Sequence, residues 1–380
     1  MKRDTQLMRL GREHHGTRSV NPVVNRASTI LAGNAHELYN RPDGTPLYGR
    51  FGTDSQNALR AALCEMQNAD YCALTPSGLS AMTLIAIAEV KSGGHLLAAD
   101  CLYGPTRMFL DDTVSRWGIE VEYYDPRIGA GIEGRLKDNT QLVLCESPGS
   151  LTFEVQDIPA ISHAAAKVGA KVMVDDTWSA GLNANMLDLG ADYAAQSLTK
   201  YIGGHSDVIM GAVLARGDAA KRLKAAEWRM GFNVSPDDAF MVLRGLRTLG
   251  IRFEKSAASS LELAQLLADH PAVTSVIHPA RADHPDHAIY LRDFSAPAGI
   301  FSVHFPSWNI ARSERFLDEL KIFGLGFSWG GFESLAVHCD PQLRRQFRPK
   351  HNGALIRFAI GLEDVEDLWS DMEQAIAASA

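Results

Sequence analysis

The sequence has few of the features that indicate a membrane, secreted or nucleic-acid-binding protein. None of its apolar runs reaches the length of a membrane span. Its basic beginning, residues 1–19, has no apolar core and contains Asp4 and Glu13, unlike a targeting peptide. The formal net charge of -8 argues against nucleic acids and anionic membranes as partners, because both repel a net anion without a dense basic patch. We therefore expect a cytoplasmic protein.

Cysteine is scarce and follows no metal or disulfide pattern. The count of five is odd, and no two cysteines have the Cys-x-x-Cys spacing of a redox motif or zinc site. We expect reduced thiols that mostly pack in the core. The residues are Cys64, Cys72, Cys101, Cys145 and Cys339.

Histidine offers no better metal site. His14 and His15 lie near the start of the chain, and His278, His284 and His287 lie in the turn-rich stretch "HPARADHPDH". Neither group has the helical i, i+4 spacing or the cysteine partners of a zinc site. We therefore expect solvated loops and no metal.

The chain does have ample apolar material for a large fold. It contains 380 residues, of which 46% are hydrophobic and 22% charged, as in a globular protein of two or three domains. From about residue 55, short apolar strands such as "YCALT", "HLLAAD", "TQLVLCES" and "KVMVDD" alternate with amphipathic helices. This alternation predicts βαβ units, and hence a doubly wound, mostly parallel α/β sheet.

The pattern changes twice along the chain. After about residue 245 a long helical stretch is followed by the strands "GIFSVHF", "SLAVHCD" and "ALIRFAIGLE", which predicts a smaller α+β domain. The first fifty residues lack a clear period and end in the turn-rich "RPDGTPLYGR". We therefore expect an N-terminal arm over residues 1–50, a large domain over 51–245 and a small domain over 246–380.

Two strand ends in the large domain carry residues suited to a ligand, because ligands of open α/β sheets bind beyond the carboxyl ends of the strands. Gly78 in "YCALTPSGLSAM" lets the backbone approach a ligand, and the helix that follows offers free N–H groups for a phosphate. Asp175 ends "KVMVD" and suits a protonated ring nitrogen. For each stretch alone there is a structural alternative, namely a helix capped by Ser77 and a capping role for Asp175.

A third strand end, "AAQSLTKYIGGHSDV", contains Lys200. Ser197 and Thr199 alternate along the strand, so both hydroxyls face one side and suit a phosphate. A lysine in a confined place has a lowered pKa and becomes a nucleophile, although a lysine after Ser-x-Thr is weak evidence alone. Together the three strand ends supply a phosphate cradle, an acid for a ring nitrogen and an amine for a Schiff base. Pyridoxal 5'-phosphate requires these three groups.

These motifs resemble the Cys/Met-metabolism family of pyridoxal-phosphate enzymes, which have fold type I, the aspartate aminotransferase-like fold. The resemblance extends from "YGRFGT" at residue 48 to "LIRFAIGLED" at residue 355. It includes "SGLSAM", "LYGPT", "VDDTWSAG", "SLTKYIGGHSDVIMG" and "FSWGGFES" in the family's order. It implies pyridoxal 5'-phosphate as cofactor, a sulfur amino acid as substrate and a homotetramer made of two catalytic dimers.

The resemblance also implies the residues that would hold the cofactor. Lys200 would form the Schiff base and then carry the Cα proton, Asp175 would keep the ring nitrogen protonated, and Tyr103 would stack on the ring. Tyr48 would assist proton transfer at the amine. The phosphate would be held by Gly78, Leu79, Ser197 and Thr199. Tyr48 and Arg50 would come from a neighbouring subunit to bind the cofactor, with Arg50 on the phosphate.

Arg357 lies in the apolar strand "ALIRFAI", where a buried arginine needs a partner. A structural salt bridge is one explanation. By the resemblance, Arg357 would instead bind the substrate α-carboxylate as a bidentate fork, with help from Ser328 and Trp329.

Within the family, three features resemble the bacterial lyases that cleave L-cystathionine by α,β-elimination to homocysteine, pyruvate and ammonia. They are "ESPGS" at residues 146–150, Trp178 and Trp329. Phe51 departs from that branch, in which a second arginine often follows "YGR". A cysteine or cystine desulfhydrase or a γ-lyase therefore remains an alternative. An aminotransferase on the same fold and a non-catalytic cofactor-binding protein are alternatives of other classes.

Overall fold

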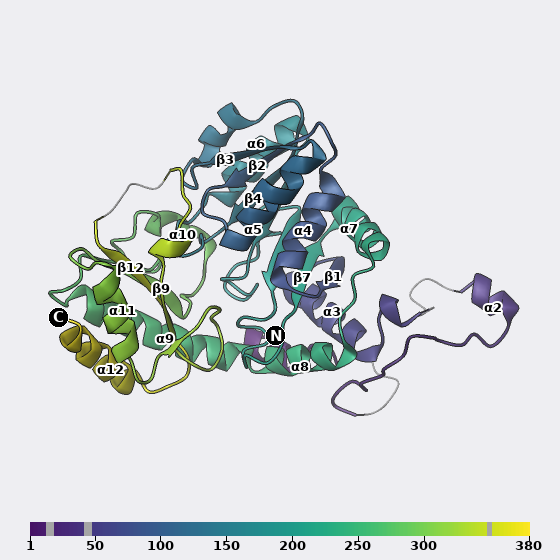
Figure 1. Ribbon diagram of the computed structural model, residues 1–380. Helices are drawn as coiled ribbons and strands as arrows, with labels where there is room; N and C mark the ends of the chain where they lie inside the picture. The colour runs from purple at the N-terminus through teal and green to yellow at the C-terminus, as the bar shows by residue number, and fades with distance from the viewer. Residues whose placement is uncertain (13–18, 42–47, 348–351) are drawn as a thin grey trace.

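The computed structural model describes residues 1–12, 19–41, 48–347 and 352–380. His14, His15 and residues 42–47 of the turn-rich stretch lie outside the described residues. Figure 1 shows two bodies, each built on a sheet, with the long helices α8 and α9 running beneath both. The division into domains at residues 50 and 245 stays a prediction.

The larger sheet has seven strands in the order β1-β7-β6-β5-β4-β2-β3. All neighbours are parallel except β7, which lies antiparallel between β1 and β6. The predicted mostly parallel α/β sheet is therefore confirmed. The strands are β1 Tyr71–Thr75, β2 His95–Ala99, β3 Glu120–Tyr124, β4 Thr140–Glu146, β5 Lys171–Asp175, β6 Tyr193–Ser197 and β7 Gly211–Ala215.

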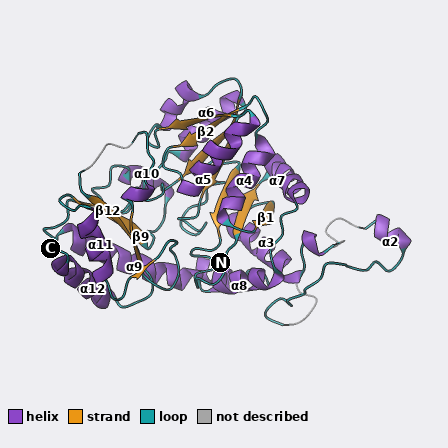
Figure 2. Cartoon of the chain, viewed as in Figure 1, coloured by secondary structure: helices purple, strands orange, loops and turns teal. Residues whose placement is uncertain are grey.

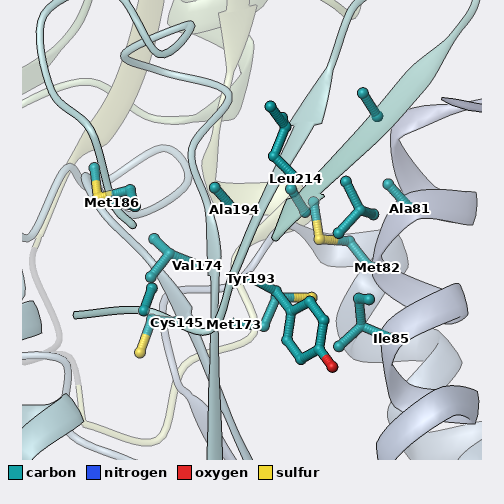
Figure 3. Packing of buried hydrophobic residues seen from close by; sticks show 14 of the residues in the cluster. Ala81, Met82, Ile85, Cys145, Met173, Val174, Met186, Tyr193, Ala194 and Leu214 are labelled. Atoms are coloured by element: carbon teal, nitrogen blue, oxygen red, sulfur yellow. The ribbon is translucent and has the colours of Figure 1, made fainter. Parts of the chain in front are cut away.

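Helices cover this sheet and bury its apolar side chains. In Figure 3, Met173 and Tyr193 point toward Met82 and Ile85 of α4, whereas Val174 points away from that helix. This alternation lets successive residues of one strand contribute to the packing on both faces. The helices of this part are α3 Asp54–Gln67, α4 Gly78–Glu89, α5 Gly104–Phe109, α6 Ile158–Val168, α7 Gly217–Met230 and α8 Pro236–Arg247, with shorter turns η1 Gly49–Phe51, η2 Leu110–Val114, η3 Ser115–Trp117 and η4 Gly129–Arg135.

The smaller sheet has five strands in the order β10-β11-β12-β9-β8 and its own apolar core around Phe301, Phe316 and Phe358. Its pairs are antiparallel except β10 with β11. The strands are β8 Ser275–Ile277, β9 Ile300–Phe305, β10 Gly324–Leu325, β11 Leu335–His338 and β12 Ala354–Ala359. The helices are α9 Leu249–Ala268, α10 His287–Asp293, α11 Ile310–Glu319 and α12 Val365–Ala378, with the turn η5 Asp340–Gln342.

The start of the chain contains structure that the sequence pattern did not predict. Helix α1 (Arg3–Arg9) packs against α8 and α9 and buries Leu7, followed by the buried Leu10. The chain then leaves the body. In Figure 2 the segment around α2 (Ala35–Tyr39) extends away from both sheets at the right. Leu31 and Tyr39 on this segment are largely exposed.

The segment after η5 joins the two sheets. The backbone N–H groups of Gln346 and Phe347 donate to one oxygen of Asp100, at 2.6 and 2.9 Å. Asp100 follows the end of β2 and also pairs with Arg107 at 2.7 Å. Arg345 donates to the carbonyl oxygen of Ser150 at 2.9 Å. The carboxyl end of the large sheet is thus fastened to a segment that follows the small sheet's strand β11.

The expectation of solvated histidine loops is wrong for His278 and His284. Both side chains are buried and hydrogen-bonded. His278 contacts the carbonyl of Ala298, and the ring of each histidine accepts the backbone N–H of the residue two positions ahead. In the described ranges, no group of three His, Cys, Asp or Glu side chains is arranged to hold a metal ion. Cys64, Cys72, Cys101 and Cys145 are free thiols. Cys64 is half-buried, whereas the other three and Cys339 are buried. Among the described helices, none is long and apolar enough to cross a membrane.

Candidate active site

The carboxyl ends of β4, β5 and β6 bring the predicted groups to one edge of the large sheet. Asp175 is the last residue of β5, and its register partners are Glu146 in β4 and Ala195 in β6. Lys200 follows β6 in a tight turn, in which the N–H of Gly204 donates to the Lys200 carbonyl at 2.8 Å. Parallel strands therefore place the amine and the acid together, as predicted for an open α/β sheet.

The Lys200 amine lies in a confined, partly buried place. Nζ donates to the hydroxyl of Ser328 at 2.6 Å and is 5.7 Å from the centre of the Trp329 ring. The pKa of Lys200 is lowered to about 8, chiefly by burial and then by the positive charge of Arg357, while Asp175 opposes both effects. About a tenth of these amines is consequently neutral at pH 7, far more than for an ordinary lysine, and the neutral amine is the nucleophilic form.

Asp175 is nearly buried, with 9% of its surface exposed. Its Oδ1 accepts both the backbone N–H of Thr177, at 3.0 Å, and the Thr177 hydroxyl, at 2.5 Å. No described residue donates to Oδ2. Burial raises the pKa of Asp175 to about 6, although the Thr177 bonds and Lys200 lower it. One carboxylate oxygen is therefore left for a cationic ligand group.

The first turn of α4 lies directly against the end of β6. A Cβ added to Gly78 would stand 2.6 Å from the Ser197 Cβ, so only glycine allows this approach. The Ser77 side chain caps the helix by accepting the N–H of Ser80 at 3.1 Å. In the part of the chain that the structure describes, nothing accepts the N–H groups of Gly78 and Leu79. Capping by Ser77 and an open anion site thus exist together.

Thr199 is less available than Ser197. Its hydroxyl accepts the N–H of Met210 at 3.0 Å and donates to the Met210 carbonyl at 3.3 Å. A phosphate contact from Thr199 would require this hydroxyl to exchange the bond that it donates to Met210.

Arg357 of β12 is buried, with 6% exposed, and reaches this edge from the small sheet. Its Nη2 donates to the carbonyl of Ser328 at 2.8 Å, whereas its buried Nε has no partner among the described residues. No described carboxylate forms an ion pair with it, so the structural salt bridge allowed by the sequence is not formed. Burial lowers the pKa of Arg357, and the guanidinium retains donors for an incoming carboxylate.

The turn that carries Ser328 has a left-handed backbone. Ser328 has a φ of 82° and Gly330 a φ of 79°. A Cβ on Gly330 would stand 2.8 Å from the backbone nitrogen of Tyr201, the residue next to Lys200. This close approach brings Ser328 to the amine and Trp329 beside it, although they are 128 and 129 positions away in sequence.

Tyr103 lies at the start of α5, with 47% of its surface exposed. Its backbone N–H donates to Oε2 of Glu146 at 2.6 Å. Burial, then Glu146 and Asp175, raise the pKa of the Tyr103 phenol, and Arg357 opposes them, so the phenol lies near all three groups. In the sequence Glu146 stands out only as part of "ESPGS", and no spacing indicates its bond to Tyr103.

The structure does not bring Tyr48 and Arg50 to Lys200 of the same chain. Tyr48 is 45% exposed and pairs with Thr29 in an isolated bridge. Arg50 donates to the carbonyl of Trp228 in α7 at 3.1 Å, and the ring of Phe51 packs on Trp228 at 4.7 Å. Contribution of Tyr48 and Arg50 to a neighbouring subunit stays a prediction.

The fold, with its lysine and aspartate at adjoining strand ends, is that of a pyridoxal-phosphate enzyme. The family model described as Cys/Met metabolism PLP-dependent enzyme matches residues 4–377, and the chain belongs to this family.

Similar proteins cover almost the whole chain. A Rhizobium johnstonii protein named "Putative cystathionine beta-lyase" is 44% identical, over 99% of this chain and 96% of its own length. Cystathionine beta-lyase MetC of Escherichia coli is 38% identical, over 99% of this chain and 98% of its own length. The crystal structure of metB from Corynebacterium glutamicum matches with a TM-score of 0.92 at 29% identity, covering 99% of this chain and 98% of that one.

Proposed function

We propose that the protein cleaves L-cystathionine to homocysteine, pyruvate and ammonia by α,β-elimination. The observation that carries the proposal is the meeting of Lys200 and Arg357 at Ser328. Nζ of Lys200 bonds the Ser328 hydroxyl at 2.6 Å, and Nη2 of Arg357 bonds its carbonyl at 2.8 Å. A reactive amine thus lies beside a carboxylate-binding group, as a reaction at the Cα of an amino acid requires. The two relatives named as lyases of this substrate support the choice.

The groups at this edge fit pyridoxal 5'-phosphate. Lys200 would hold it covalently, and the open oxygen of Asp175 would bind its ring N–H. The free N–H groups of Gly78 and Leu79, with the Ser197 hydroxyl, would bind its phosphate. When bound, this cofactor supplies an electron sink for the Cα of an amino acid.

The chain's own side chains would do the rest. Arg357 would bind the α-carboxylate, with Ser328 and Trp329 beside it, and so orient the Cα–H bond toward Lys200. The Lys200 amine would take the Cα proton as a general base. The Cβ–S bond then breaks, the electron pair leaves with sulfur, and a proton converts the thiolate to homocysteine. Water releases the remaining carbon skeleton as pyruvate and the nitrogen as ammonia.

We also propose that the site is completed by a second copy of the chain in a homotetramer of two catalytic dimers. The exposed Tyr48, and Arg50, would reach the neighbour's site, Arg50 at the phosphate and Tyr48 at the amine. The large exposure of Leu31 and Tyr39 on the segment around α2 supports an interface on this side, because burying large apolar side chains against a second copy is favourable.

Identification of the keto acid tests the proposed activity. With L-cystathionine, the protein loaded with cofactor should release pyruvate and homocysteine, and Lys200→Ala should release neither. Release of 2-oxobutyrate would contradict the proposal and assign a γ-lyase, which the family also contains. Phe51 stands where the bacterial lyases often have a second arginine. Cysteine and cystine must therefore be tested as substrates beside cystathionine. Pyruvate from cysteine or cystine but not from cystathionine would assign a desulfhydrase. Accumulation of pyridoxamine phosphate would assign an aminotransferase. Absence of any product would assign a non-catalytic protein.

A further inference from the structure

A second carboxyl group lies beside Asp175, and the proposed reaction does not use it. Glu146 is the last residue of β4 and the register partner of Asp175 in β5. Adjacent parallel strands are about 4.8 Å apart, and register partners project to the same face. Glu146 and Asp175 therefore stand at the same edge of the sheet and on the same side of it.

Glu146 is held in place by its main chain and uses its carboxyl group for one contact. Its carbonyl oxygen accepts a hydrogen bond from Nε2 of Gln156 at 2.7 Å and a weaker one from the Cys101 thiol at 3.5 Å. No described lysine or arginine forms an ion pair with its carboxyl group. The carboxyl Oε2 instead accepts the backbone N–H of Tyr103 at 2.6 Å.

Tyr103 depends on this contact, because it precedes a helix of only six residues and its side chain forms no cap. Its carbonyl accepts the N–H of Arg107 at 3.1 Å, which ties it to α5 but not to the sheet. The bond from Glu146 is thus the link between the Tyr103 main chain and the strand that borders Asp175.

We propose that Glu146 is a positioning residue, whose carboxyl group fixes the Tyr103 backbone and thereby holds the Tyr103 ring over the ligand bound between Lys200 and Asp175. The inference rests on the proposed function, in which Tyr103 stacks on the cofactor ring.

The groups around Glu146 indicate which replacement preserves the contact. Asp175 faces it from β5, Tyr103 from the start of α5, Glu154 from the loop after β4 and Arg345 from the segment after η5. Burial and then Asp175 raise the pKa of Glu146 well above its usual range, while the Tyr103 bond and Arg345 oppose them. A neutral carboxyl group still accepts a hydrogen bond through its carbonyl oxygen, as a glutamine amide does.

Two variants separate the hydrogen bond from the charge. Glu146→Gln keeps a hydrogen-bond acceptor on a side chain of the same length. Glu146→Asp keeps the carboxyl group on a side chain that is shorter by one methylene group. A matched control is Glu154→Gln, which alters a buried carboxyl nearby that accepts the Thr152 hydroxyl at 2.7 Å. Each holoenzyme is compared by its kcat/KM, its dissociation constant for pyridoxal 5'-phosphate and the circular dichroism of the bound cofactor.

We expect E146Q and E154Q to remain within about twofold of the unchanged protein. We expect E146D to lose on the order of tenfold in kcat/KM and to alter the dichroism of the cofactor, because a ring displaced by a fraction of an ångström stacks poorly. In a Tyr103→Ala background, E146D should cause no further loss beyond about twofold, since the ring that it positions is absent.

Three results would overturn the inference: full activity in E146D, an equal loss in E146Q and E146D, or losses of E146D and Y103A that multiply. Failure of the proposed function looks different, because the unchanged protein would then bind no cofactor or release no pyruvate from cystathionine. The dichroism and the dissociation constant of the cofactor test the role of Glu146 whichever substrate the enzyme uses.

Discussion

At the scale of single residues, the site brings together the buried Arg357 and the partly buried Lys200, and among the described residues Asp175 is the aspartate near the Lys200 amine. Lys200 and Arg357 each bond Ser328, and neither forms an ion pair with a described carboxylate. Burying a charge without a matching partner is costly, and a protein retains such an arrangement where a ligand supplies the missing anion. The free chain should therefore be less stable for having these groups.

We predict that Lys200→Met stabilises the cofactor-free protein at pH 7, on the order of 2 kcal/mol. The pKa of Lys200 is about 8 in the folded chain against 10.5 for an ordinary lysine. Between these values the unfolded chain binds a proton that the folded chain does not, so the stability of the unchanged protein rises with pH. The advantage of K200M should consequently shrink from pH 8 upward and vanish above about pH 10.5.

Urea unfolding at pH 7 and pH 10, with the exposed Lys91→Met as control, measures this difference. An advantage of K200M that is the same at both pH values would show that the Lys200 amine is not destabilised by its surroundings.

Arg357→Lys provides a second prediction. It retains the positive charge but loses the planar fork, so we expect kcat/KM to fall about 10- to 100-fold. The unfolding free energy of the cofactor-free protein should not fall, since the guanidinium makes one hydrogen bond and has an unpartnered Nε. Steady-state kinetics beside a urea titration check both parts, and wild-type kcat/KM in R357K would contradict a role in carboxylate binding.

At the scale of elements, the contact of α4 with the end of β6 shapes the proposed phosphate site. We predict that Gly78→Ala weakens binding of pyridoxal 5'-phosphate, because the added Cβ would stand 2.6 Å from that of Ser197 and must push the helix start away. Overpacking of this kind costs about 1–3 kcal/mol. Gly134→Ala is the matched control, because its Cβ meets nothing within 4 Å. Equal cofactor dissociation constants for the two variants would contradict the prediction.

The elements also show how far the sequence predicts the fold. Strands such as β1, β4 and β5 and the helix α6 follow from apolar patterns in the sequence, because each pattern is local. The position of β7 does not, since "VIMGAVLAR" predicts a strand but not its antiparallel insertion between β1 and β6. Helix α1 is too short for its period to stand out from the sequence.

The same distinction applies to the site. Lys200 and Asp175 follow strands, so their proximity follows from sheet topology. The bonds of Ser328 to Lys200 and Arg357, and of Glu146 to Tyr103, join residues 29 to 128 positions apart. They depend on how the two sheets and their loops pack, which no sequence spacing encodes.

At the scale of the whole molecule, the segment around α2 extends from the body, and none of its described residues bonds to Lys200 or Asp175. If Tyr48 completes a neighbour's site, two inactive variants should restore each other. In a mixed dimer of Lys200→Ala and Tyr48→Ala subunits, one site combines the intact lysine with the intact tyrosine. We predict recovery of activity, up to about a quarter of the unchanged protein's, after the variants are unfolded and refolded together.

Separately refolded K200A and Y48A are the controls for this experiment. Mixtures that stay as inactive as either variant would show that Tyr48 acts within its own chain or not at all.

The Asp100 carboxylate has a consequence for motion between the two bodies. It anchors two successive amides of a strand-free segment, and that segment leads directly into the part of the chain that carries Arg357. A swing of the small sheet away from the large one must either carry these residues along or sever two bonds to a buried acid. Separation of the two sheets is therefore opposed by a contact between residues that are 246 and 247 positions apart in sequence.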